Sequence, residues 1–337
     1  MEKPVLSKLY VRNYSELYEY LNNSLKKIKP LEGEDFKLFM KKKITSAYQV
    51  IESELNKLLE ALVLIQNAGD FYRELFKVYT GSTVEEYIVD VKKRIKLARN
   101  IYKWAIQELS SLDSKRKRKI VLTFRAGIGR LLSIYKRMDK RVVLVKEYLK
   151  EVSKMPDTRG DYIVVLAGLP QVGKSTLLSK LTSAKPEIGS YPFTTKTLIA
   201  GHLVVEPYGR IVIIDSPGIL DTPIEEKNII EYKAILALKH LADHVVYLFA
   251  YTPSFYYTLQ EQLNVYESVK RLLGDKPITI VFNKVDLLSK TELEEYMGEI
   301  ESKTGIKPIP VSALTGYNLD EIRQLLVSYL KEKKKLQ

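Results

Sequence analysis

One short segment leaves this chain few possible folds. It reads Gly-Leu-Pro-Gln-Val-Gly-Lys-Ser over residues 168–175 and directly follows an apolar run, Tyr162 to Ala167. The glycines let the backbone wrap closely around an anion, and the helix expected next would turn its free N–H groups toward that anion. Strand, loop and helix at this spacing match the phosphate-binding P-loop at every fixed position. We therefore predict an α/β domain that binds a nucleotide.

Two side chains of this loop have expected chemical roles. Lys174 would reach the β- and γ-phosphates and assist catalysis, and the hydroxyl of Ser175 would bind Mg²⁺. The residues expected to contact the nucleotide phosphates are Gly168, Pro170, Gln171, Val172, Gly173, Lys174, Ser175 and Thr176.

Short apolar runs and helical stretches alternate along the rest of the chain. This alternation predicts a mostly parallel sheet flanked by helices, whose ligands bind beyond the carboxyl ends of the strands. The expected strands are 162–167, 197–206, 210–214, 244–250, 278–282 and 307–311, and the expected helices are 174–182, 225–241, 258–273, 290–303 and 319–332.

Two segments are expected to respond to the γ-phosphate and its metal. Asp215 ends an apolar strand and would hold Mg²⁺ through water, while the N–H of Gly218 would sense the γ-phosphate. In the segment 190–196 a threonine could add its hydroxyl to the Mg²⁺ shell, and we favour Thr195 over Thr194. The alternative is a solvated loop whose threonines only precede a strand.

Two further motifs predict the nucleobase. In Asn283-Lys284-Val285-Asp286, Asp286 can accept both N–H donors of the guanine edge, and adenine presents no such pair. The triplet Ser312-Ala313-Leu314 could supply a backbone N–H to guanine O6. With the P-loop, these motifs predict a Ras-like P-loop GTPase domain with a mostly parallel sheet flanked by helices.

The first half of the chain has a different pattern. From residue 4 to 154, apolar side chains recur every three or four residues, which predicts amphipathic helices packed as a bundle. We expect a basic helical bundle domain over residues 1–158 and the GTPase domain over 159–337, joined by a polar hinge at 155–158. The predicted fold class is α followed by α/β.

All of the net charge of +13 lies in that first half. Residues 1–158 carry 33 Lys and Arg against 20 Asp and Glu, whereas residues 159–337 carry 21 of each. The segment 115–141 alone holds eleven cations and one acid, Asp139. Such a run is often only a solvated face, and an anionic membrane surface is a competing partner. We favour RNA, whose phosphates the cations could neutralise without reading bases.

Several runs resemble the nucleolar GTP-binding protein (Nog) family of Obg-like GTPases, in its short archaeal form. They are Tyr191-Pro-Phe-Thr-Thr-Lys196, Gly201-His202, Asp215-Ser-Pro-Gly-Ile-Leu-Asp221 and, in the helical half, Tyr148-Leu-Lys-Glu-Val-Ser-Lys-Met-Pro-Asp157. The resemblance implies a GTP-hydrolysing switch in large ribosomal subunit assembly that binds ribosomal RNA through its helical domain.

Two positions depart from related GTPases. Ile219 stands where Ras-like proteins carry the glutamine that orients the attacking water, so we expect slow intrinsic hydrolysis completed by an unknown activating partner. Gln171 stands where Obg-like relatives often carry an asparagine that helps to hold an activating potassium ion. Potassium activation is therefore uncertain.

Two other functions fit the same motifs. The chain could be a signalling or scaffold switch whose helical domain binds a protein, or a GTP-binding module that does not hydrolyse. The absence of cysteine and of any apolar run near the roughly 20 residues that span a bilayer favours a cytoplasmic protein.

Overall fold

The computed structural model describes residues 10–182, 185–217, 220, 238–252 and 255–335. These residues form two compact units that divide between Lys150 and Glu151. The sequence had suggested a division after residue 158. We call the two parts the helical unit and the C-terminal unit, and each is described by itself.

The helical unit follows the predicted helical period. In its longest helix, α2, the side chains of Ile51, Leu55 and Leu58 are at most 1% exposed. This buried stripe packs against α4 and α5. The helices of this unit in the described residues are α1 (Tyr14–Lys27), α2 (Phe36–Asn67), α3 (Asp70–Thr80), α4 (Val84–Ser111), α5 (Lys117–Lys136) and α6 (Asp139–Val152).

Local signals set several of the helix ends. Asn13 caps α1 in a capping box with Glu16, and the Asp35 carboxylate accepts hydrogen bonds from the first backbone N–H groups of α2. Gly81 ends α3 in a left-handed conformation with φ 75°. Gly127 lets α5 approach α2 closely, because a Cβ there would lie 2.4 Å from Ile44 Cδ1.

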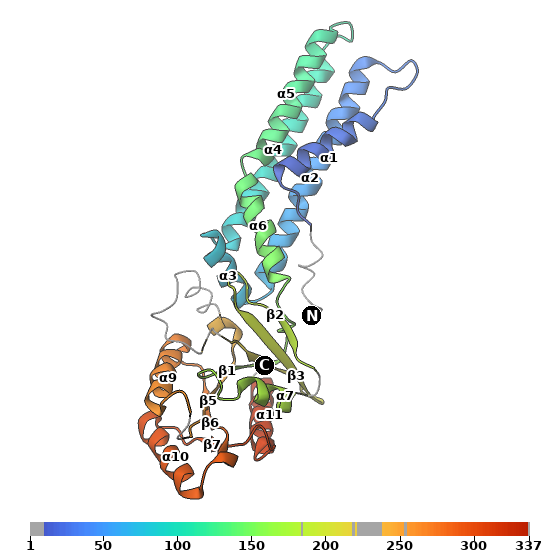
Figure 1. Cartoon of the computed structure of the whole chain (residues 1–337). Coiled ribbons are helices and arrows are strands. Elements are labelled where there is room, and N and C mark those ends of the chain that lie inside the picture. Colours follow the sequence, from blue (N-terminus) through green and yellow to red (C-terminus); the bar gives the residue numbers. More distant parts are fainter. Residues whose placement is uncertain (1–9, 183–184, 218–219, 221–237, 253–254, 336–337) are drawn as a thin grey trace. The chain divides into compact units, whose positions relative to one another are not determined.

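In the C-terminal unit, the described residues form a seven-stranded sheet in the order β2-β3-β4-β1-β5-β6-β7. The pairs β4-β1-β5-β6-β7 are parallel, whereas β2-β3 and β3-β4 are antiparallel. Figure 1 shows helices beside this sheet. Its strands are β1 (Tyr162–Ala167), β2 (Glu187–Ser190), β3 (Thr197–Val205), β4 (Gly209–Asp215), β5 (His244–Phe249), β6 (Ile278–Phe282) and β7 (Ile309–Pro310), and its helices include α7 (Lys174–Leu181), α9 (Leu259–Leu273), α10 (Lys290–Thr304) and α11 (Leu319–Lys335).

The edge strand β2 was not predicted. It spans four residues, includes Gly189, and leaves the side chain of Ile188 72% exposed, so it carries no apolar alternation. Its pairing with β3 defines it instead. The predicted helix 225–241 lies outside the described residues except at its end, where residues 238–241 are helical.

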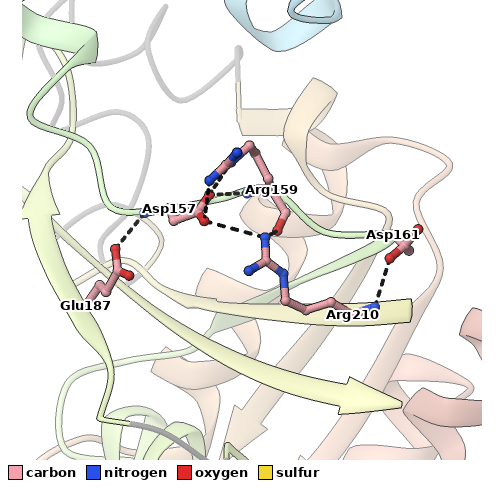
Figure 2. Close-up of polar contacts among 5 residues, drawn as sticks. All are labelled: Asp157, Arg159, Asp161, Glu187 and Arg210. Atoms are coloured by element: carbon pink, nitrogen blue, oxygen red, sulfur yellow. Dashed lines mark hydrogen bonds and ion pairs between the residues drawn. The ribbon is translucent and has the colours of Figure 1, made fainter. Parts of the chain in front are cut away.

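The chain enters the C-terminal unit along a segment that is bonded to the sheet. The carbonyl of Lys154 accepts a hydrogen bond from Ser190 N at 3.1 Å. A Cβ at Gly189 would lie 2.5 Å from that same carbonyl oxygen, so glycine permits the close approach. Glu187 accepts from Asp157 N at 3.0 Å (Figure 2). The segment expected to be a hinge is therefore tied to β2.

A second set of contacts ties the same segment to β4. Arg159 donates through Nε and Nη2 to both oxygens of Asp157, at 2.7 and 2.8 Å, and Arg210 donates to the carbonyl of Arg159 (Figure 2). The backbone N–H of Arg210 donates to Asp161 at 2.8 Å. Burial raises the pKa of Asp157, but hydrogen bonds from Arg159 and the charge of Arg210 outweigh it and lower the pKa to about 2.

We expect Asp157→Asn to reduce the free energy of unfolding by about 1–2 kcal/mol at pH 7, because it removes a charge-assisted pair. The folded-state pKa lies below the ordinary value of 3.8, so the contribution is complete above that pH and is lost as the pH falls through about 2. Denaturant unfolding followed by circular dichroism should show a smaller difference in unfolding free energy between the variant and the unchanged chain at pH 2.5 than at pH 7.

Asp320→Asn is the matched control, since Asp320 pairs with Arg323 while its side chain is 86% exposed. It should change stability by less than about 0.5 kcal/mol. Equal effects of the two variants at pH 7, or an Asp157→Asn effect that persists at pH 2.5, would contradict the assignment.

A candidate nucleotide site at the carboxyl edge of the sheet

The loop after β1 adopts backbone conformations that its glycines permit. Gly168 has φ 134° and Gly173 has φ 99°, both in the region that favours glycine. A Cβ at Gly168 would lie 2.5 Å from the carbonyl oxygen of Leu248 on β5. Gln171 also has a positive φ, 67°, which is uncommon outside glycine and asparagine. The loop thus turns tightly between the sheet and α7.

The ammonium group of Lys174 lies across this loop. Its Nζ donates to the carbonyls of Gly168 at 2.7 Å and Leu169 at 3.0 Å, and the residue is only 8% exposed. A buried cation beside the N-terminus of α7 favours an anion there, since both the charge and the helix dipole have the same sign. The predicted phosphate-binding loop therefore has the electrostatics that phosphates need.

Two oxygen ligands suited to Mg²⁺ come together from neighbouring elements. Ser175 lies in the first turn of α7, and its Oγ donates to Asp215 Oδ2 at 2.5 Å. Asp215 is fully buried at the end of β4, the strand that pairs with β1. A hydroxyl and a carboxylate beside a phosphate loop fit Mg²⁺, which usually takes one or two protein oxygens and completes its shell with phosphates and water. No cluster of three or more metal-binding side chains occurs in the part of the chain that the structure describes.

Asn283 joins three loops of the site. Its side chain is buried at the end of β6, where Nδ2 donates to the carbonyl of Val172 at 2.8 Å. Its Oδ1 accepts from the N–H of Ala313 at 2.9 Å. A Cβ at Gly173 would lie 2.2 Å from Asn283 Nδ2, so the second glycine of the loop makes room for this amide. The amide therefore sets the P-loop against both predicted base-recognition loops.

The other residues predicted to bind the base lie on these two loops. Lys284 has φ 66° and precedes a short 3-10 turn that carries Asp286, whose side chain is exposed. Ser312 is buried, and its Oγ accepts from Thr315 N at 3.2 Å. Leu314 is 73% exposed. The structure thus brings Asn283, Asp286 and the 312–314 triplet to one edge, beyond the carboxyl ends of β6 and β7.

The two threonines in the segment before β3 have different surroundings. Thr194 Oγ1 donates to the carbonyl of Tyr191 at 3.0 Å and accepts from Lys196 N at 3.1 Å, so its hydroxyl stabilises a local turn. The side chain of Thr195 is exposed. This difference favours Thr195 as the residue that could reach a metal. Gly218 and Ile219 lie outside the described residues.

The sequence analysis did not predict that Asn283 bridges two loops. The motif suggested contacts with the base, whereas the structure places both polar ends of the amide on protein backbone. An asparagine directly after a largely apolar strand was the available signal, because a buried amide must find partners.

Two family models match the chain. The one described as the NOG1 N-terminal helical domain matches residues 18–158. The one described as nucleolar GTP-binding protein 1 matches residues 229–286.

Similar proteins come from archaea and eukaryotes. An uncharacterized protein of Methanocaldococcus jannaschii is 33% identical over 261 residues, which is 75% of this chain and 70% of that protein. Nucleolar GTP-binding protein 1 of Drosophila melanogaster is 31% identical over 281 residues, 82% of this chain but 42% of the fly protein. The chain thus spans less than half of that relative. A solved structure described as a nucleolar GTP-binding protein 1 from Plasmodium falciparum has 31% identity and a TM-score of 0.42, covering 52% of this chain and 88% of that one.

We expect Asn283→Asp to weaken GDP binding at least about tenfold, equivalent to about 1.4 kcal/mol. The new carboxylate could still accept from Ala313 N, but it would place an oxygen against the Val172 carbonyl. Titration with a fluorescent GDP analogue would measure the change. Asn264→Asp, at an exposed position on α9, is the control and should bind normally. Unchanged affinity in Asn283→Asp would remove the bridging role.

Proposed function

The chain belongs to the nucleolar GTP-binding protein 1 family, and we propose that it hydrolyses GTP to GDP and phosphate as a Mg²⁺-dependent switch in large ribosomal subunit assembly. The observation that carries the proposal is the convergence on one sheet edge of Lys174, the Ser175–Asp215 pair and the Asn283 bridge. The first two supply groups for phosphates and metal, and the bridge supports the loops that would hold guanine. The matching family model and the fly relative are named as GTP-binding proteins.

Each group in the site has a proposed task. Lys174 stabilises charge on the β- and γ-phosphates, and Asp286 accepts the two N–H groups of guanine. Bound Mg²⁺ would neutralise charge that develops on the phosphates during hydrolysis. Ser175 and Thr195 would hold that ion through their hydroxyls, and Asp215 would hold it through water. We assign no group to the attacking water.

The segment 190–196 is proposed to change with the bound nucleotide. It begins at Ser190 on β2, whose N–H donates to the carbonyl of Lys154. Glu187 on the same strand accepts from Asp157 N. A change in the segment would therefore act on residues 154–157, the part of the chain that leads into the C-terminal unit.

The helical unit is proposed to bind ribosomal RNA. Its support is the excess of 33 cations over 20 acids in residues 1–158, together with relatives whose names place them in the nucleolus. In the residues that the structure describes, no helix is long and apolar enough to cross a membrane.

Base recognition is tested by Asp286→Asn. An amide can donate to the extra carbonyl of xanthine but cannot accept both guanine N–H groups, so we expect GTP affinity to fall at least about 100-fold while XTP binding appears. Competition against a fluorescent nucleotide measures both. Asp275→Asn, an exposed position before β6, should keep the preference for GTP. Retained GTP preference in Asp286→Asn would exclude this base contact.

Intrinsic hydrolysis should be slow, because Ile219 cannot orient water as a glutamine does. We expect single-turnover rates on the order of 10⁻³ s⁻¹ or below without a partner. Phosphate release from a preloaded GTP complex would measure the rate, with Lys174→Ala as the control that loses it. Turnover above about 1 s⁻¹ by the isolated chain would refute the expectation.

The ribosomal partner is tested by co-sedimentation with purified large subunits, using a non-hydrolysable GTP analogue and GDP. We expect salt-sensitive binding that favours one nucleotide, and no nucleotide dependence in Lys174→Ala. Absence of binding in both states would leave a protein-binding switch as the better function.

A further inference from the structure

Two loops that are far apart in the sequence lie at one end of the helical unit. One joins α1 to α2 and the other joins α4 to α5, and Figure 1 shows both at the same end of the bundle. Lys37 Nζ donates to the carbonyl of Leu112 at 2.9 Å. A hydrogen bond from Ser114 is the main cause that lowers the pKa of Asp35. We call residues 26–43 and 112–119 the distal tip.

The distal tip gathers a strong positive charge. It contains twelve Lys and Arg against four Asp and Glu. Three of the acids have structural tasks: Asp35 caps α2, Glu34 accepts from Leu31 N and pairs with Lys42, and Asp113 accepts from Lys115 N. Each of these acids is held by a local contact, so the more numerous cations dominate the surface.

The cations of the second loop are available to a partner. The side chains from Lys115 to Lys119 are all exposed. Within the described residues, none of them forms an ion pair with a carboxylate. They are therefore not committed to holding the bundle together.

The placement of these cations also opposes helix stability. Lys117, Arg118 and Lys119 occupy the first turn of α5, which has no acidic residue, and the N-cap Arg116 makes no side-chain cap hydrogen bond. Cations at a helix N-terminus face the positive end of the dipole, at a cost of about 0.3–1 kcal/mol each. Folding gives no reason for them, whereas a polyanionic partner does.

We propose that the distal tip docks on the phosphate backbone of folded RNA, with both loops contacting the same RNA. This inference rests on the proposed RNA-binding function and names the surface that carries it. Clustered, flexible Lys and Arg side chains suit phosphates, which they neutralise regardless of base sequence. Docking should depend steeply on salt, because each neutralised phosphate releases counterions.

The scarcity of exposed apolar side chains at the distal tip favours RNA over a membrane. The exposed large apolar side chains at the distal tip are Leu31, at 69%, and Leu38, at 50%. Two leucines among twelve cations do not form the broad apolar face that interfacial helices insert between lipids. A membrane partner is nonetheless an outcome that the test must detect.

The test compares three variants of the full chain, each with four exposed or half-buried cations changed to Gln. The first-loop set changes Lys26, Lys27, Lys29 and Lys41, the second-loop set changes Lys115, Arg116, Lys117 and Arg118, and the control set on the body of α4 changes Lys92, Lys93, Lys96 and Lys103. Circular dichroism checks folding, and GDP affinity checks that the C-terminal unit is unaffected.

Filter binding to deproteinised large-subunit ribosomal RNA between about 50 and 300 mM salt is the measurement. We expect each tip set to weaken binding at least about tenfold at 100 mM salt. The slope of the logarithm of the binding constant against the logarithm of salt concentration should become shallower by about 1 for each phosphate contact that is lost. The control set should weaken binding less than about threefold. This pattern would support the distal tip as the surface that binds RNA.

The other outcomes each overturn a defined statement. If the unchanged chain does not bind RNA, the proposed RNA function fails and the inference fails with it. If it binds RNA but the control set loses as much affinity as the tip sets, the distal tip is not the RNA-binding surface, and RNA binding itself stands. If only one tip set matters, the two loops do not form one surface. If phosphatidylglycerol vesicles bind more tightly than RNA and the tip sets abolish that binding, the partner is a membrane.

Discussion

The buried amide of Asn283 is the interaction on which the candidate site depends. It donates to the carbonyl of Val172 in the P-loop and accepts from the N–H of Ala313 after β7, while its backbone N–H donates to Phe249 at the end of β5. In a parallel sheet, the loops that follow different strands meet at the carboxyl edge, where ligands bind. Here one side chain links the predicted phosphate loop to a predicted base loop, and the burial of Asn283 strengthens both hydrogen bonds.

The edge of the sheet beyond β4 has a different role. Strand β2 carries no strong apolar pattern, yet it pairs with β3. Its residues Glu187 and Ser190 also form hydrogen bonds with the segment that enters the unit. The Asp157–Arg159 pair and Arg210 fasten that entering chain to β4. The proposed switch segment therefore begins at a strand that is bonded to residues well before it in sequence.

In the helical unit, the buried residues that stabilise the fold are distinct from the cations at the start of α5. Ile51, Leu55 and Leu58 on α2 are at most 1% exposed, and Gly127 on α5 lies close to Ile44 of the same helix. The cations at the start of α5 make no such contacts and oppose its dipole. The charge at the start of α5 is thus independent of packing, which is what a surface for a polyanion requires.

Sequence alone determined the elements whose signal is local. The P-loop, the strand ends at Asp215 and Asn283, and the helical period through α2 could all be read from spacing, because glycine conformation, strand length and apolar period act over a few residues. Tertiary structure alone decided the pairing of β2, the partners of the Asn283 amide and the meeting of two loops at the distal tip. Those features join residues distant in sequence, and the free energy that selects them comes from contacts that exist only after the chain has folded.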